Sequence, residues 1–423
     1  MDINKLLQGV DCTCGRRHTC SIDYVYIENN AFARLEHICK SYSRILLVAD
    51  ENTYSAAGKQ TENVLRNKDV SKIIFTGSQV LVPDENAISK VTQSLCNTDL
   101  IIGIGSGVIQ DLCKYVSFYN NIPYIIVATA PSMDGYASNG AAMITDGMKV
   151  TYPAGLPVAI IADVTVLADA PIDMLKAGYG DVVGKLSALN DWKLSHIVNC
   201  EYFCNYIYNL TYEQVKKTLS LAEGILDRDE QSIKALMEAL VVIGILMSFA
   251  GSSRPASGSE HHLSHFFEIT GIISKEKYLP HGIDVAFSTV VTAKIRESIT
   301  KSAFPHNIYR PSEEQYRSDM QEIYGEVAQG CIELQNKVGN YSADRTQCYL
   351  LKEEEIKSVL SQMPNSSEIR QMLSLVDLDM EYFYEFYGNE KIKKAIKYAK
   401  DLKDRYTVLW LYYDLFGDKE DVQ

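Results

Sequence analysis

The sequence predicts an α/β half followed by an all-helical half, and three observations support this division. Short runs rich in valine and isoleucine alternate with helix-like stretches between Arg44 and about Asp169. Beyond Pro171 the strand signals stop, and helical spacing continues almost to the end of the chain. The 423 residues are 46% hydrophobic and 22% charged, an ordinary composition for a globular chain of two or three domains. We therefore expect domains at residues 1–169 and 170–423.

Five apolar runs define the predicted sheet. Continuous runs of this kind are typical of strands buried on both faces, so we expect a parallel sheet covered by helices on both sides. The runs are Arg44–Asp50, Ser71–Gly77, Asp99–Gly105, Ile122–Ala128 and Val158–Asp163. Between Gly140 and Pro153 an Asp146-Gly147 turn signal separates two short runs, which predicts a β-hairpin projecting from the sheet.

The second half carries helical spacing in most of its length. The predicted helices are Asp173 to about Leu194, Tyr212–Leu226, Ile233–Ser248, Gly282 to about Thr300, and several amphipathic helices between Glu313 and Leu415. The most apolar run, Ala239–Ala250, is shorter than the roughly 20 residues that span a bilayer. It is interpreted as a buried helix, and no membrane insertion is expected.

The charge and the cysteines limit the partners and the compartment. Lys plus Arg number 41 and Asp plus Glu number 54, giving a net charge of −13 that repels nucleic acid and acidic membranes. An anionic small substrate would need a local cluster of donors. The ten cysteines are scattered, and no secretory signal is evident at the N-terminus, so we expect no disulfide framework and a cytoplasmic location.

Gly103-Ile-Gly-Ser-Gly107 directly follows a predicted strand and opens a helix. Glycines there let the backbone approach a pyrophosphate, which the amides at a helix N-terminus then bind. The spacing differs from the usual dinucleotide fingerprint, so a purely structural turn is the alternative. Asp50, at the end of the first strand, suits a ribose diol but equally suits a helix N-cap.

A second loop leaves the predicted sheet at the carboxyl end of a strand, where ligands of open α/β sheets bind. This loop, Thr129–Ser138, is rich in hydroxyl groups and contains Asp134. These side chains suit a polar ligand, although an ordinary loop would tolerate the same residues.

Three of the eight histidines fall within five residues, and a fourth, His281, stands in a Pro-His-Gly loop. On a helix, His261 and His265 lie one turn apart on the same face, whereas His262 points about 100° away. Asp181, at the start of a long predicted helix, could add a carboxylate. One carboxylate and two imidazoles can hold a divalent metal that polarises an oxygen atom, and a structural His-rich helix is the alternative.

The N-terminal stretch from Cys12 through Cys14 and His18 to Cys20 could pass for a zinc knuckle. Structural zinc sites usually pair two such half-sites, and the second half is absent here. We therefore expect a structural strand or hairpin with no assigned chemistry.

Five motifs together, GIGSGVIQD, TAPSMDGYAS, GYGDVVGK, RPASGSEHHLSH and LPHG, carry a family resemblance. The chain resembles the iron-containing alcohol dehydrogenase and dehydroquinate synthase superfamily, and within it the bacterial sn-glycerol-1-phosphate dehydrogenases. The resemblance covers residues 10 to 300, roughly. It implies a Rossmann-like NAD or NADP domain, a helical domain, a dehydroquinate synthase-like fold overall, and a homodimer.

The resemblance also implies one divalent metal, Zn, Ni or Fe, held by Asp181, His261 and His281. His261 is preferred over His265 because related synthases place a phosphate-binding arginine seven residues before the metal histidine, where Arg254 stands. His265 is then a substrate contact or proton relay. The residues implied at the cofactor are Asp50, Gly105, Ser106, Gly107, Asp111, Thr129, Ser132 and Ser138.

The implied reaction is the reduction of dihydroxyacetone phosphate to sn-glycerol 1-phosphate by hydride transfer at C2. Asp134 would hold a substrate hydroxyl, and Arg254 and Lys149 would bind the phosphate. Arg254 as a structural helix cap and Lys149 as an exposed hairpin lysine are the alternatives. A glycerol or other polyol dehydrogenase, a synthase-like lyase and cyclase, and a non-catalytic nucleotide-binding protein remain open. The synthases carry Glu where Asp181 stands, and a non-catalytic protein would have lost a ligand.

Overall fold

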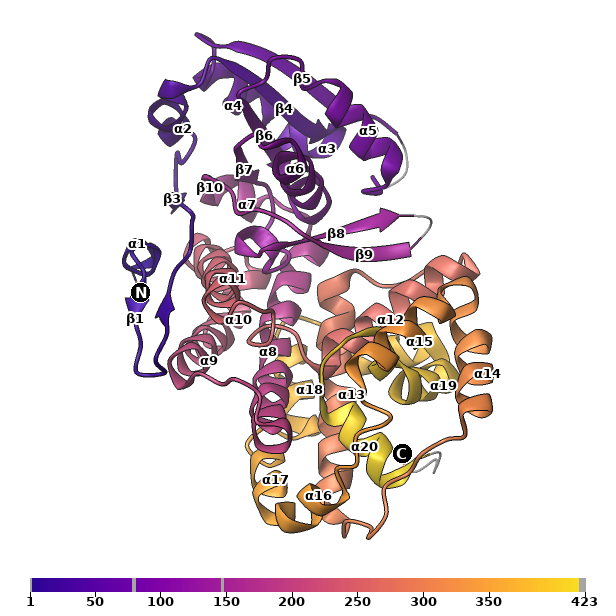
Figure 1. Cartoon of the computed structure of the whole chain (residues 1–423). Coiled ribbons are helices and arrows are strands. Elements are labelled where there is room, and N and C mark those ends of the chain that lie inside the picture. The colour runs from indigo at the N-terminus through magenta and orange to yellow at the C-terminus, as the bar shows by residue number, and fades with distance from the viewer. Residues whose placement is uncertain (1, 78–80, 146–147, 418–423) are drawn as a thin grey trace. The chain divides into compact units, whose positions relative to one another are not determined.

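The computed structural model describes residues 2–77, 81–145 and 148–417, drawn as ribbon in Figure 1. The chain divides into two compact units, Met1–Val182 with Glu213–Ser253, and Val183–Tyr212 with Arg254–Gln423. Helices α8 (Ile172–Asn199) and α9 (Asn205–Leu219) contribute residues to both units. The predicted boundary at residue 169 marks where the strands end, whereas the compact units are interleaved along the chain.

A six-stranded parallel sheet with strand order β3-β10-β7-β6-β4-β5 organises the first unit. Its strands are β3 (Tyr24–Glu28), β4 (Arg44–Asp50), β5 (Asp69–Phe75), β6 (Leu100–Gly105), β7 (Tyr124–Ala128) and β10 (Ala159–Asp163). The five predicted strands are confirmed to within about two residues at either end. The edge strand β3 was not predicted, and it pairs with β10 from the far end of the α/β half.

Both faces of the sheet are buried, as the apolar runs predict. On β4, Ile45 and Leu47 pack into one core with α2 and α4, and Leu46 and Val48 pack into the opposite core with α5 and α6. Full burial of one such side chain stabilises the fold by about 1.5–3 kcal/mol. The helical and 3-10 or π segments of this unit are α1 (Ile3–Leu7), α2 (Ala33–Ile38), η1 (Cys39–Ser41), α3 (Glu51–Thr53), η2 (Tyr54–Gly58), α4 (Lys59–Val64), α5 (Glu85–Gln93), α6 (Gly107–Asn120), η3 (Gly135–Ala137), α7 (Val164–Ala168), α10 (Ala222–Leu226) and α11 (Glu230–Ala250).

Two antiparallel hairpins stand apart from the sheet. The predicted hairpin is confirmed as β8 (Gly140–Thr145) and β9 (Met148–Pro153), with Gly140 opposite Pro153. Its turn, Asp146-Gly147, lies outside the described residues. At the N-terminus β1 (Val10–Asp11) pairs with β2 (Arg17–His18), so the hairpin expected around Cys12 and Cys14 is also confirmed.

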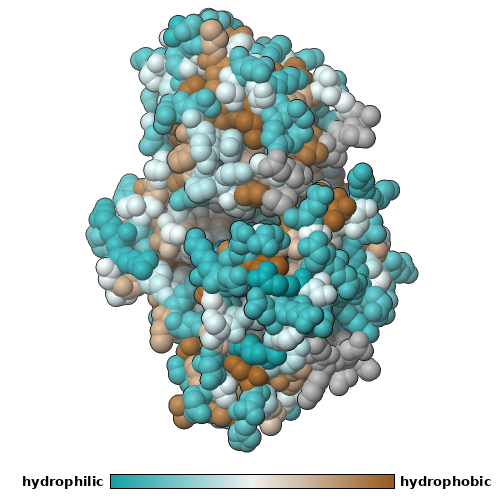
Figure 2. Space-filling model, turned by 45° about the vertical axis from the view of Figure 1, so that its right-hand side comes forward, coloured by the Kyte–Doolittle hydropathy of each residue, from teal (hydrophilic) through white to brown (hydrophobic). Residues whose placement is uncertain are grey.

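Helix α11 is apolar along most of its length and longer than the run singled out in the sequence. It is the one helix, within the described residues, with the length and composition to cross a membrane, and 83% of its most apolar 18-residue window is buried inside the protein. On the face shown in Figure 2, hydrophobic residues form small separate patches among hydrophilic ones. Burial in the first unit accounts for the apolar composition of α11, because this helix packs against η3, α7 and α10.

The second unit is helical throughout its described residues. Its segments beyond α8 and α9 are α12 (Ser259–Ser274), α13 (His281–Lys301), α14 (Glu313–Tyr324), η4 (Gly325–Val327), α15 (Ala328–Val338), α16 (Thr346–Leu351), α17 (Glu353–Leu360), α18 (Ser366–Ser374), α19 (Met380–Tyr398), η5 (Ala399–Leu402) and α20 (Val408–Phe416). Helices α12 and α13 pack against each other and bring His261, His265 and His281 together.

Candidate metal and cofactor site

Three adjacent strands end at the same edge of the sheet and present the predicted cofactor residues there. Strand β6 lies between β4 and β7, with Ile104 opposite Ala49 and Gly105 opposite Ala128. The residues that follow these strands therefore lie side by side, and the backbone N–H of Thr129 donates to the Gly105 carbonyl at 3.1 Å. Ligands of parallel sheets bind at this edge.

The three glycines at the end of β6 and the start of α6 differ in how much room a side chain would have. A Cβ at Gly103 would lie 2.9 Å from the Cys113 sulfur, and one at Gly105 would lie 2.6 Å from Ile109, so both are required by packing. A Cβ at Gly107 would approach nothing closer than 3.9 Å. No side chain caps α6 at Ser106, so the first N–H groups of this helix suit the oxygens of a phosphate.

Asp50 caps the N-terminus of α3, which is the structural role that the sequence left open for it. Its side chain accepts from the backbone N–H of Thr53 at 2.8 Å, and Thr53 Oγ1 accepts from the Asp50 N–H, forming a capping box at α3. Asp50 is only partly buried, and a contact with a cofactor ribose stays a prediction. Asp111 has two local partners, because its carboxylate accepts from the Ala142 N–H at 3.1 Å and from Lys114 at 3.3 Å.

Lys114 is a positioning residue that sequence reasoning missed. Its buried ammonium donates to the carbonyls of Gly135 and Gly140, both at 2.9 Å, and to Ser138 Oγ at 3.2 Å. Burial lowers the pKa of Lys114, and nearby Asp111 opposes that shift. One cation thus ties α6 to the Thr129–Ser138 loop and to the first residue of β8. The available signal was its place one turn after Asp111, just beyond the GIGSGVIQD motif.

The Thr129–Ser138 loop is held against two helices by glycines. A Cβ at Gly178 of α8 would lie 1.8 Å from the Pro131 carbonyl oxygen, and one at Gly244 of α11 would lie 2.8 Å from the Asp134 carbonyl oxygen. The Asp134 N–H donates to Asp181 Oδ2 at 2.9 Å. The loop therefore positions Asp134 beside Asp181, while Ser132 is partly exposed within the same loop.

Three histidine rings converge at the N-terminal ends of α12 and α13. Ring centroids lie 5.1 Å apart for His261 and His281, 5.7 Å for His265 and His281, and 6.3 Å for His261 and His265. His261 and His265 share a face of α12, as predicted, and His281 is the first residue of α13. These rings form one imidazole cluster.

Asp181 adds a carboxylate to two of these imidazoles, those of His261 and His281. One potential ligand atom from each of Asp181, His261 and His281 lies within 4.8 Å of the others. His261 Nδ1 contacts Glu260 Oε1 at 2.7 Å, and His281 Nδ1 contacts Ser264 Oγ at 3.2 Å. Because such outer contacts occupy Nδ1, Nε2 is the nitrogen that each ring would offer to a metal.

Glu260 is a second residue that sequence reasoning missed, although it directly precedes the histidine pair. Burial raises the pKa of Glu260, but the hydrogen bonds from His261 and the Gly258 N–H outweigh burial and leave the pKa below its ordinary value. His262 has a different environment. It is fully buried, and burial holds its pKa well below the ordinary value, so it is a neutral core residue, in keeping with its orientation on the predicted helix.

Arg254 and Lys149 were predicted to bind phosphate. Arg254 is 5% exposed, and its guanidinium donates to both carboxylate oxygens of Glu201, at 2.6 and 2.5 Å, and to the Tyr406 carbonyl at 2.8 Å. This ion pair supports the structural alternative, and a contact with phosphate stays a prediction. Lys149 follows the turn of the hairpin, and its side chain lies outside the described residues.

A third basic residue, Arg405, was not singled out in the sequence. It follows η5, and its guanidinium donates to the Ser257 carbonyl at 3.1 Å, just before α12. Burial, and next the charge of Arg254, lower its pKa to about 10. Arg254 and Arg405 therefore place two positive charges close to the start of α12. Arg405 belongs to a C-terminal segment that contains none of the five sequence motifs.

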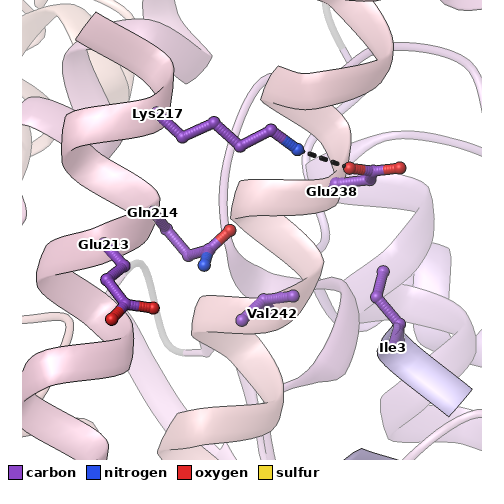
Figure 3. A pocket seen from close by; sticks show the side chains of 6 residues that line it. All are labelled: Ile3, Glu213, Gln214, Lys217, Glu238 and Val242. Carbon is purple, nitrogen blue, oxygen red and sulfur yellow. Dashed lines mark hydrogen bonds and ion pairs between the residues drawn. The ribbon is translucent and has the colours of Figure 1, made fainter. Parts of the chain in front are cut away.

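A small surface pocket in the first unit contains none of the predicted site residues. Figure 3 shows its lining, where Lys217 of α9 and Glu238 of α11 pair across it at 2.7 Å. Ile3, Glu213, Gln214 and Val242 complete it. Lys217 is paired with Glu238, which leaves Glu213 as the third charged group of the lining.

Comparison with known proteins first defines a class. Residues 26–171 match the family described as iron-containing alcohol dehydrogenase. The structure of the iron-containing alcohol dehydrogenase from Thermococcus thioreducens is similar, with a TM-score of 0.59 at 14% identity, covering 93% of this chain and 98% of that one. The chain thus shares the fold of this class, which combines an α/β part with a mostly helical part.

Curated relatives then specify the family. A glycerol-1-phosphate dehydrogenase (NAD(P)+) from Halalkalibacterium halodurans is 30% identical over 95% of this chain and 94% of its own length. A second, from Geobacillus stearothermophilus, is 34% identical over 66% of this chain and 71% of its own length. The chain belongs to the glycerol-1-phosphate dehydrogenase family.

Proposed function

We propose that this protein is a metal-dependent, NAD(P)H-linked oxidoreductase that interconverts dihydroxyacetone phosphate and sn-glycerol 1-phosphate. Family membership over nearly the whole chain is the observation that carries this proposal. The related glycerol and polyol dehydrogenases act on uncharged substrates, so the choice of substrate within the proposal depends on phosphate recognition.

The metal would be held by Asp181, His261 and His281, whose potential ligand atoms lie within 4.8 Å of one another. One carboxylate and two imidazoles with open positions suit Zn²⁺, Ni²⁺ or Fe²⁺. When bound, such an ion polarises the substrate carbonyl and stabilises the negative charge that develops on its oxygen. Glu260 and Ser264 hold the two imidazoles in position, and the Asp134 N–H holds the carboxylate.

The cofactor would lie at the carboxyl edge of the sheet, with its pyrophosphate on the N–H groups that follow Gly105 and Ser106. Reduced nicotinamide, when bound there, would supply the hydride for C2 of the ketone. Asp134 would hold a substrate hydroxyl and align C2, since hydride transfer depends on geometry. His265, the third imidazole of the cluster, would contact the substrate or pass a proton to the nascent alcohol.

The substrate and metal are tested together by following NADH oxidation after chelation and metal addition. We expect dihydroxyacetone phosphate to be reduced far faster than dihydroxyacetone or a simple aldehyde, and activity to return only with a divalent metal. Preference for the unphosphorylated ketone would instead favour a polyol dehydrogenase.

The metal ligands are tested by His281→Ala and Asp181→Ala. Loss of an outer contact to a metal ligand costs about 10–100-fold, so loss of a ligand itself should reduce kcat by more than about a hundredfold. NADH binding, measured by fluorescence, should stay nearly unchanged. Full activity in either variant would remove the proposed ligand set.

We also propose a cytoplasmic location and a homodimer. None of the ten cysteines is in a disulfide, a state typical of reducing compartments. Light scattering on the purified protein measures the oligomeric state directly.

A further inference from the structure

Four residues from two distant parts of the chain form a second cluster of metal-binding side chains. One potential ligand atom from each of Cys12, Cys14, His18 and Cys204 lies within 4.8 Å of the others. The first three come from the β1–β2 hairpin, and Cys204 directly precedes α9. The fourth ligand that the N-terminal sequence lacks is therefore supplied from almost two hundred residues away.

The turn of the hairpin brings its two cysteines together. The Gly15 N–H donates to the Cys12 carbonyl at 3.0 Å, and the Cys12 N–H donates to the Arg16 carbonyl at 3.1 Å. Gly15 has a φ of +85°, a conformation that a larger residue adopts only with strain. The sequence Cys-Thr-Cys-Gly thus closes a tight turn that holds both thiols near His18.

His18 is oriented as metal-binding histidines commonly are. Its Nδ1 lies 3.1 Å from the Phe249 carbonyl oxygen, which requires the proton on Nδ1, and its ring stacks on Phe249 with centroids 5.4 Å apart. Its Nε2 lies 3.5 Å from the Cys14 sulfur. A carbonyl that fixes the tautomer and directs the other nitrogen to the metal is typical of such sites.

We propose that Cys12, Cys14, His18 and Cys204 bind a structural Zn²⁺ ion. Zinc with Zn–S bonds of about 2.3 Å and a Zn–N bond of about 2.0 Å in tetrahedral geometry places S and N ligand atoms about 3.5 Å apart and two sulfurs about 3.8 Å apart. The Cys14–His18 separation of 3.5 Å matches this geometry. Three thiolates and one imidazole form a closed ligand set typical of structural zinc sites.

The site shares no residue with Asp181, His261 and His281 and needs no part of the proposed reaction. Binding would release the thiol protons as three Zn–S bonds and one Zn–N bond form. The hairpin needs such support because β1 and β2 have only two residues each, and an isolated hairpin is at best marginally stable. The ion would hold the two short strands and their turn together.

Cobalt substitution tests the site without depending on activity. The protein is purified under reducing conditions, stripped of metal and loaded with Co²⁺. We expect about two cobalt ions per chain and an intense ultraviolet band from thiolate-to-cobalt charge transfer. The carboxylate and imidazole cluster contains no sulfur, so it cannot produce that band.

Variants assign the band to these residues. Cys14→Ser should abolish or strongly weaken the band and lower bound metal to about one per chain, whereas Cys96→Ser, at an exposed cysteine elsewhere, should change neither. His18→Cys should retain and strengthen the band, which separates a loss of ligand from a loss of folding.

Two results would overturn the proposal. One is a wild-type spectrum without the charge-transfer band in fully reduced protein. The other is a disulfide between two of Cys12, Cys14 and Cys204, located by mapping the oxidised cysteines in unreduced, denatured and chelated protein. If the band is present but reductase activity is absent, the zinc site stands and only the proposed function fails.

Discussion

Arg254 shows how the partners of one residue alter its interpretation. Its guanidinium faces Glu201 along two hydrogen bonds, and the two side chains are 7% and 30% exposed. A bidentate ion pair of this kind, largely shielded from solvent, stabilises the local structure in the absence of substrate. The sequence offset from His261 predicted a phosphate contact, but it could not show that a carboxylate would occupy the same donors.

Paired variants separate the two roles of Arg254. If the residue is structural, Arg254→Ala and Glu201→Gln should both lower the unfolding free energy, by somewhat less than the roughly 3–5 kcal/mol for breaking a fully buried pair, because Glu201 is partly exposed. Thermal unfolding measures this. If Arg254 instead binds phosphate, Arg254→Ala alone should raise KM for dihydroxyacetone phosphate far more than for dihydroxyacetone.

Asp284 predicts a dependence of stability on pH. Burial raises its pKa well above the ordinary 3.8, although the Tyr387 hydroxyl, at 3.0 Å, opposes the shift. A raised pKa means that the folded state holds this proton more tightly than the unfolded state. The stabilisation is therefore complete below the ordinary pKa and is lost as pH rises through the raised one.

Asp284→Asn keeps the shape and an oxygen that can accept from Tyr387, but it does not ionise. The unfolding free energy of the variant relative to the wild type should increase as pH rises from about 4 to about 8. The increase should be about 1.4 kcal/mol for every tenfold by which the folded protein binds this proton more tightly than the unfolded chain. Urea unfolding at several pH values measures this difference. A constant difference would show that Asp284 does not titrate in this range.

Among the elements, α8 packs against the Thr129–Ser138 loop at a glycine. A Cβ at Gly178 would lie 1.8 Å from the Pro131 carbonyl, a backbone atom that cannot move without the loop. Gly178→Ala should therefore weaken NADH binding at least severalfold and destabilise the protein. Gly330→Ala in α15 is a matched control, because a Cβ there meets nothing and the helix should gain up to about 1 kcal/mol.

Elements were predictable where local pattern and tertiary environment agree. The five apolar strands and the β8–β9 hairpin follow from runs and a turn signal within a few residues of one another. Strand β3 has an alternating burial pattern at the edge of the sheet, and only its pairing with β10 reveals it. The region from Tyr212 to Leu226, expected as one helix, contains the end of α9 and the separate helix α10.

The sequence pointed to the candidate metal ligands that the structure brings together, but not to the residues that contact and position the site. Asp181, His261 and His281 stand in motifs with recognisable spacing, whereas Lys114 and Arg405 act through contacts with residues remote in the sequence. Cys204 is the clearest case. It has no sequence neighbour that marks it, and only folding places it beside Cys14.

At the scale of the whole molecule, the net charge of −13 opposes the approach of a phosphorylated substrate. Raising ionic strength from about 0.01 M to about 0.15 M shortens the screening length from about 30 Å to about 8 Å. With saturating NADH, kcat/KM for dihydroxyacetone phosphate should rise modestly, while that for dihydroxyacetone should stay constant. A steep fall in kcat/KM for dihydroxyacetone phosphate would instead show that local positive charge, such as that of Arg405, attracts the substrate more strongly than the net charge repels it.

Helix α6 connects the proposed cofactor site with the loop that would hold the substrate. Its first turn begins at Gly107, where the cofactor pyrophosphate would bind, and Asp111 and Lys114 one and two turns later fasten β8 and the loop that contains Asp134. If NADH binding moves this helix, the contacts of Asp111 and Lys114 would transmit the movement to the residues proposed to contact the ketone. We expect compulsory-order kinetics, with the nucleotide binding first and leaving last, and product-inhibition patterns in the steady state will reveal that order.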